Sequence, residues 1–202
     1  MRKVLAALLC LVIGTFGIAW AQTAGEAGIG DDFYPFLGNG GYDVQHYLID
    51  LEVSPDYSAL DGLVTFDAIA TQTLSQFNLD LMGMTVDSID VDGQPATFTR
   101  ELSELVITPA APIESGTTFS VTVTYHGVPG EDSDGRTIDF SGGWYPYEGG
   151  ALVAAEPAGA RQWFPCNDHP LDKATFAFHI SVPDDSVVVA NGILKYRFAE
   201  AG

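Results

Sequence analysis

Apolar and polar residues alternate along much of the chain after residue 40, and a period of two is typical of a β-strand with one buried face. In the clearest segment, 119–125, four apolar residues alternate with serine and threonine. Other segments show the same alternation, or a short apolar run bounded by turn residues. We therefore predict strands at 47–53, 64–71, 77–81, 86–91, 105–108, 119–125 and 176–182.

Turn residues separate these predicted strands. Asp92-Gly93 is a dipeptide that tolerates the positive φ angles of a tight hairpin, and further turns are predicted at Gly62, Pro109, Gly116 and Pro183. No window keeps a helical period for three turns. The pattern predicts an all-β fold of mostly antiparallel, layered sheets in a sandwich.

Two segments lack a sustained period. Residues 22–39 are rich in glycine and alanine, and are predicted to form a flexible leader before a β domain at 40–202. Residues 130–150 are predicted to form an irregular loop, and loops of this length are usually functional or disordered. The acidic residues 131–135 resemble a calcium loop, but the other ligands of an EF-hand are missing, so a solvated acidic loop is favoured.

The N-terminus has the organisation of a secretory signal peptide at 1–21. Arg2 and Lys3 precede an apolar run that ends in Ala19-Trp20-Ala21, a small-x-small cleavage site. The run approaches the lower length limit of a membrane-spanning helix, but the Ala-x-Ala site favours cleavage after Ala21. The mature protein is expected to be secreted or extracytoplasmic, with no membrane association after cleavage.

Composition narrows the classes of partner. The chain has 202 residues, of which 47% are hydrophobic and 17% charged, as expected for one globular domain with a core. Its formal net charge is −19. Nucleic acid and anionic lipid are therefore poor partners, because both require a basic face.

The residues of a catalytic zinc site are not found in this sequence. Such a site needs two histidines four residues apart with a glutamate between them, and His46, His126, His169 and His179 lack that spacing. The four histidines are expected to be ordinary surface or strand residues. Cys166 is left alone once the signal peptide is removed, and is expected to be a small buried apolar residue.

The segment from Glu156 to Pro170 carries the strongest candidate chemistry. Its three prolines hold the backbone in extended or turning conformations, so Glu156 is expected in a rigid, non-helical setting. A fixed carboxylate beside aromatic residues is a good receptor for an ammonium group. The residues alone leave a second interpretation equally open, in which Glu156 pairs with Arg161 or Lys173 and only ties the loop down.

Several motifs follow one another in order along the chain. They are Tyr42–Glu52, Gly142-Gly143-Trp144-Tyr145, Glu156-Pro157 with Ala160-Arg161, Phe164-Pro165-Cys166 with Asp168 and Pro170, Lys173–Phe176, and Val189–Gly192. This series, spanning about residues 40–194, resembles the N-terminal domain of the aminopeptidase N family of zinc metallopeptidases, the gluzincin aminopeptidases. Gly159 and His169 stand where the family often has Asp and Glu, which leaves the subgroup open.

The resemblance implies a saddle-like sandwich that packs against a thermolysin-like catalytic domain. In this family a loop glutamate or glutamine binds the free α-amino group of the peptide substrate, and the matching residue here is Glu156. The zinc cofactor, its ligands and the general base belong to the catalytic domain. The resemblance therefore assigns no catalytic residue and no metal to this chain, and implies two partners, a peptide N-terminus and the chain's own C-terminal catalytic domain.

The leading hypothesis is the N-terminal substrate-binding and scaffold domain of a secreted zinc aminopeptidase, truncated at Gly202 before the catalytic domain and inactive alone. The alternative is a stand-alone exported β-sandwich that binds a peptide, a polysaccharide or a protein through Trp144, Tyr145 and Tyr147. Folding and ligand binding by the isolated, metal-free domain would favour the alternative.

Overall fold

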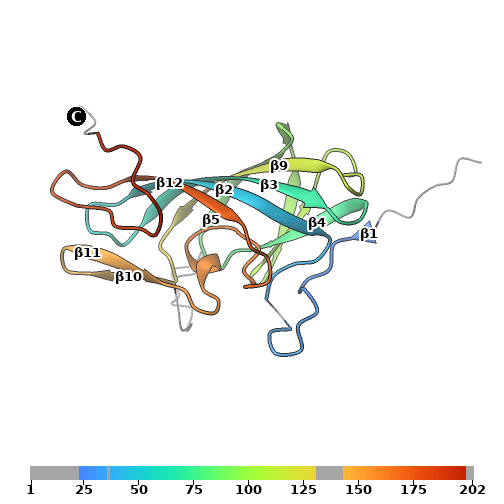
Figure 1. Ribbon diagram of the computed structural model, residues 1–202, viewed down its shortest axis with the longest axis horizontal. Helices are drawn as coiled ribbons and strands as arrows, with labels where there is room; N and C mark the ends of the chain where they lie inside the picture. Colours follow the sequence, from blue (N-terminus) through green and yellow to red (C-terminus); the bar gives the residue numbers. More distant parts are fainter. Residues whose placement is uncertain (1–22, 36, 131–142, 199–202) are drawn as a thin grey trace, which may run out of the picture.

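The computed structural model describes residues 23–35, 37–130 and 143–198 (Figure 1). Within these ranges the chain forms three β-sheets and a short 3-10 helix, η1 (Ala160–Gln162). No helix in the described ranges has the length and apolar character needed to cross a bilayer. The predicted signal peptide 1–21 and the acidic residues 131–135 lie outside the described residues, so both remain predictions.

The larger layer is a six-stranded sheet with the order β12-β2-β3-β9-β5-β6 (Figure 1). Alternating apolar residues of its long strands are buried, and their polar neighbours face outward, as the sequence pattern predicts. All pairs are antiparallel except β12 and β2, which run parallel at one edge. The strands are β2 (Tyr42–Val53), β3 (Leu60–Ala70), β5 (Thr85–Val91), β6 (Gln94–Pro95), β9 (Thr118–Gly127) and β12 (Thr175–Ser181).

A four-stranded sheet packs on the inner face of this layer. It has the order β1-β4-β8-β7, from β1 (Thr23–Ala24), β4 (Leu74–Asp80), β8 (Glu104–Thr108) and β7 (Thr97–Glu101). The ring of Phe77 on β4 lies 5.5 Å from the ring of Phe119 on β9. The Tyr42 hydroxyl donates to the Asn78 carbonyl oxygen at 2.7 Å, which joins the two layers. The predicted all-β layered fold is confirmed.

A separate hairpin of β10 (Gly143–Tyr147) and β11 (Gly150–Ala154) corrects one prediction. Part of the segment expected to be irregular is regular here, because Trp144 pairs with Val153 and Tyr145 with Leu152 across the two strands. The Trp144 indole N–H also donates to the Tyr57 carbonyl oxygen at 2.9 Å. That bond fixes the hairpin to the turn between β2 and β3.

The segment 23–39 also has more structure than its composition predicted. Thr23–Ala24 forms β1, and the Gly25 amide donates to the Gln76 carbonyl oxygen at 2.8 Å. Asn39 at its end is fully buried. Backbone pairing of this kind leaves no periodic trace in the side chains, which explains why the pattern did not show it.

Gly62 was predicted as a turn, and this prediction was wrong. The residue lies inside β3, where a Cβ atom would come within 2.3 Å of the Tyr125 ring. Tyr125 is buried and its hydroxyl donates to the Trp163 carbonyl oxygen at 2.9 Å, so the ring has little freedom to move. Glycine is needed here for close packing rather than for a turn.

Gly62→Ala is therefore expected to lower the free energy of unfolding by about 1–3 kcal/mol, the usual cost of overpacking. Urea denaturation measures the change. Gly40→Ala is the matched control, because a Cβ atom there makes only ordinary contacts, the nearest at 3.5 Å. Equal stability of the two variants would contradict the packing role of Gly62.

Candidate functional site

Glu156 stands at the start of the loop that leads from β11 to η1. Its side chain is exposed, and its peptide bond to Pro157 is cis. Within the described part of the chain, its carboxylate makes no hydrogen bond or ion pair. Neither Arg161 nor Lys173 pairs with it, so the described contacts give no support to a loop-tying role.

The loop beyond Glu156 is packed into the protein. Every residue from 161 to 169 is buried. The turn of η1 is closed by the Trp163 amide, which donates to the Ala160 carbonyl oxygen at 3.0 Å. The rings of Trp163 and Phe164 lie 4.4 Å apart. An exposed carboxylate thus precedes a segment that the core holds in place.

A buried charge network fixes this segment. The Arg161 guanidinium lies 3.8 Å from a carboxylate oxygen of Asp80 and 3.8 Å from one of Asp168. The other Asp80 oxygen accepts hydrogen bonds from the Asn39 side-chain amide at 3.0 Å and from the Asp168 backbone N–H at 2.9 Å. All four residues are buried. The network connects β4, the segment before β2 and the loop that follows Glu156.

Asp80 has a second acidic neighbour in this network. It pairs across the strands with Glu104 at the ends of β4 and β8. Burial, and then the nearby Glu104 carboxylate, raise the pKa of Asp80 to about 8. Burial also raises the pKa of Glu104. Two carboxyl groups so placed cannot both ionise at low cost, so the pair retains one proton near neutral pH.

Asn167 anchors the far end of the loop. Its side-chain oxygen accepts from the Asn39 backbone N–H at 2.6 Å, and its amide group donates to the Asn39 carbonyl oxygen at 3.2 Å. Its backbone N–H donates to the Tyr47 hydroxyl at 3.0 Å. The Asn167 side-chain amide also donates to the Asp172 carboxylate. The pKa of Asp172 is raised to about 6, mainly by burial. The loop is therefore held at both ends.

Predictions for Asp80 and His169 need correction. In the predicted strand 77–81, alternation places Asp80 on the polar side, opposite Leu79, but both faces are covered at this end of β4 and Asp80 is fully buried. His169 was expected to be an ordinary surface or strand residue, but its side chain is 1% exposed and its Nε2 lies 3.3 Å from Asp31. Neither residue is marked by a local pattern.

Other predictions for single residues agree with the structure. His46, His126 and His179 lie on strands with partly exposed side chains. Cys166 is a free, buried cysteine, and burial raises the pKa of its thiol, which keeps it protonated. A catalytic thiolate is therefore disfavoured at this position.

The three aromatic residues of the alternative hypothesis, Trp144, Tyr145 and Tyr147, differ in exposure. Trp144 is half-buried, and its ring lies 6.5 Å from that of Trp163. Tyr145 and Tyr147 are 45% and 61% exposed. Trp144 therefore serves packing, and only the two tyrosines present a contact surface.

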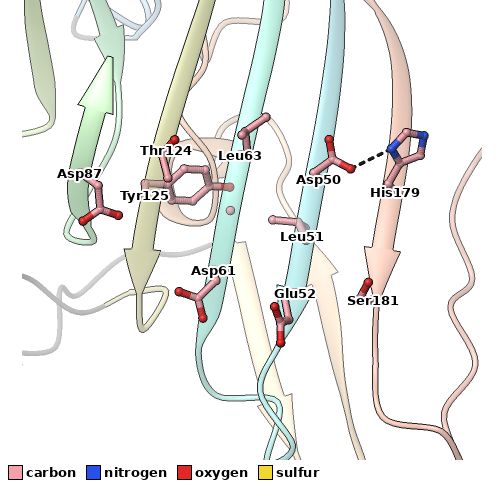
Figure 2. A pocket seen from close by; sticks show the side chains of 11 residues that line it. Asp50, Leu51, Glu52, Asp61, Leu63, Asp87, Thr124, Tyr125, His179 and Ser181 are labelled. Carbon is pink, nitrogen blue, oxygen red and sulfur yellow. Dashed lines mark hydrogen bonds and ion pairs between the residues drawn. The ribbon is translucent and has the colours of Figure 1, made fainter. Parts of the chain in front are cut away.

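An open groove of about 340 Å³ crosses the outer face of the six-stranded sheet (Figure 2). Figure 2 shows Asp50 hydrogen-bonded to His179, at 2.8 Å, and Glu52 beside Asp61 on the neighbouring strand. Among the described residues, no three His, Cys, Asp or Glu side chains are grouped as a metal ion requires. The groove is lined by Asp50, Leu51, Glu52, Asp61, Gly62, Leu63, Asp87, Thr124, Tyr125, His179 and Ser181.

The sequence matches the family model of the Peptidase M1 N-terminal domain over residues 43–200. Leucine aminopeptidase 2 of Vanderwaltozyma polyspora is 25% identical over 188 residues, which cover 84% of this chain and 28% of that protein. The chain thus spans less than a third of the length of this relative.

Solved structures agree with the family match. An M1 zinc metallopeptidase from Deinococcus radiodurans is 33% identical with a TM-score of 0.77, over 86% of this chain and 40% of that chain. A variant of that peptidase has been solved with a Tyr-Ser-Ala substrate. A yeast LTA4 hydrolase is 26% identical with a TM-score of 0.55, over 71% of this chain and 23% of that chain.

Proposed function

Because the chain belongs to the Peptidase M1 N-terminal domain family, we propose that it is the substrate-binding and scaffold domain of an exported zinc aminopeptidase. In this proposal Glu156 binds the free α-amino group of a peptide substrate. The enzyme then removes the N-terminal amino acid.

The observation that carries the proposal is the setting of Glu156. Its carboxylate is exposed and, within the described residues, makes no hydrogen bond or ion pair, while the segment after it is buried and hydrogen-bonded. A carboxylate that is positioned but not engaged can accept charge-assisted hydrogen bonds from an ammonium group. Such an arrangement recognises free amino termini and disfavours blocked ones.

We assign hydrolysis to a catalytic domain outside this chain. The described residues lack a group of three side chains suited to a metal ion, so they do not fit a catalytic zinc. We propose that the zinc lies in that catalytic domain, and the similarity to M1 zinc metallopeptidases supports this proposal.

Exposed apolar side chains offer a surface for that domain. Phe176 on β12 is 47% exposed, and Val189 and Leu194 in the following segment are 90% and 80% exposed. Exposed apolar side chains that form a contiguous patch are typical of a surface that contacts another protein. We propose that they pack against the catalytic domain.

Glu156→Ala tests the proposal in the enzyme that this domain forms with its catalytic zinc domain. We expect kcat/KM for an aminoacyl anilide to fall by about 10- to 150-fold, because the lost charge-assisted contact is worth about 1.5–3 kcal/mol. Glu156→Gln keeps an acceptor oxygen and is expected to lose less. Steady-state kinetics measures both variants.

Glu148→Ala is the matched control, since Glu148 is an exposed glutamate at the tip of the β10–β11 hairpin. It is expected to keep the parent kinetics. Unchanged KM and kcat in Glu156→Ala would return Glu156 to an ordinary surface residue and overturn the proposed function.

A further inference from the structure

The Asp168 carboxylate contacts the loop close to Glu156. Its Oδ2 accepts hydrogen bonds from the backbone N–H of Gly159 at 3.0 Å and of Arg161 at 3.4 Å. The Arg161 side chain lies 3.8 Å from the same oxygen. One buried oxygen therefore holds the chain three residues after Glu156.

Asp168 is itself fixed to the core. Its backbone N–H donates to the Asp80 carboxylate at 2.9 Å. Asp80 and Cys166 exchange two backbone hydrogen bonds, at 2.8 and 3.1 Å. The oxygen that holds Gly159 thus belongs to a residue anchored on β4, which is part of the four-stranded sheet.

Gly159 is suited to this contact. Its φ angle is 142°, in the region that favours glycine. Only Pro157 and Ala158 separate it from Glu156. Since the Glu156 side chain has no described contact of its own, its position depends on the backbone that Gly159 helps to hold.

We infer that Asp168 is a positioning residue for amine recognition, and that it acts by holding the Gly159 backbone so that the Glu156 carboxylate stays at the substrate's α-amino group. This inference rests on the proposed function. It assigns no contact between Asp168 and substrate. A displacement of about 1 Å in a binding group can reduce catalysis by up to about a hundredfold, so such a role is measurable.

A double-mutant cycle in the enzyme with its catalytic domain tests this role. Asp168→Ala is expected to lower kcat/KM for an aminoacyl anilide about tenfold when Glu156 is present. In a Glu156→Ala background the same substitution should lower kcat/KM by less than about twofold, because its effect passes through Glu156. Asp168→Asn keeps one acceptor oxygen and is expected to lose about threefold, again only when Glu156 is present. If the alanine variant does not fold, the asparagine cycle decides.

Inhibition by product analogues gives a second readout that a purely structural role would not change. The preference for L-tryptophan over indole-3-propionate, which lacks the amino group, should fall in Asp168→Ala and Asp168→Asn. A general loss of folding would lower the amount of active enzyme and leave the ratio of the two inhibition constants unchanged. Suppose that Glu156→Ala lowers kcat/KM, but that the Asp168 substitutions lower kcat/KM by the same factor whether residue 156 is glutamate or alanine. That result would overturn the positioning role and leave the proposed function intact. No effect of Glu156→Ala would overturn both.

Discussion

Arg161→Met is expected to lower the free energy of unfolding at pH 7 by about 3–5 kcal/mol, because removal of one partner leaves buried charge uncompensated. The Arg161 guanidinium lies 3.8 Å from Asp80 and 3.8 Å from Asp168, and both carboxyl groups are buried. Methionine fills a similar volume, so the loss of stability measures the removal of the positive charge more than the creation of a cavity.

Urea denaturation at pH 7 and pH 5 measures this effect. The loss should be smaller at pH 5, because Glu104, whose pKa is raised by burial, can then take up a proton, which lowers the negative charge that Arg161 offsets. Arg197→Met is the control, because Arg197 is exposed and a surface change should stay within about 0.5 kcal/mol. A loss of less than about 1 kcal/mol for Arg161→Met would show that the network tolerates an unpaired aspartate.

The domain should become less stable as the pH rises from about 4 to about 8. The pKa of Asp80 is raised from its ordinary value of 3.8 to about 8, chiefly by burial. Across this interval the folded chain keeps a proton that the unfolded chain has released. The stabilisation is therefore complete below about pH 4 and is lost toward pH 8, with a slope that approaches 1.4 kcal/mol per pH unit, about the value for one proton.

Glu104→Gln isolates this contribution. The neighbouring Glu104 carboxylate raises the pKa of Asp80, so its removal should lower that pKa and flatten the pH dependence. Asp172, with a pKa of about 6, acts in the same direction at lower pH, so the comparison is made between pH 6 and 8. Glu148→Gln is expected to keep the parent slope. Equal slopes for the parent and Glu104→Gln would contradict a shared proton.

Strands with one buried face were predictable because their signal is local. β9 alternates buried and outward residues from Phe119 to His126, and β2 does so on either side of a bulge between Val44 and His46. The Asp92-Gly93 turn has positive φ angles at both residues, as predicted. β7 was not predicted. Four of its five residues are exposed, so the sheet neighbour β8, rather than a buried face, determines it.

The candidate site was only partly predictable. The prolines around Glu156 mark a constrained loop in the sequence alone, but the residues that hold the loop are distant from it. Asp80 contacts Asp168 across 88 positions and Asn39 across 41. No periodicity encodes such contacts, and an aspartate next to apolar residues in a strand predicts an outward side chain by default.

The parallel pairing of β12 with β2 bears on the order in which the chain can fold during synthesis. Thr175 meets His46 across 129 positions, whereas β2 and β3 are joined by a short turn. The antiparallel pair can form soon after its residues leave the ribosome, but one edge of β2 must wait for almost the whole domain to be translated. Until then the unpaired backbone groups of that edge can pair with a strand of another chain, which is a route to aggregation.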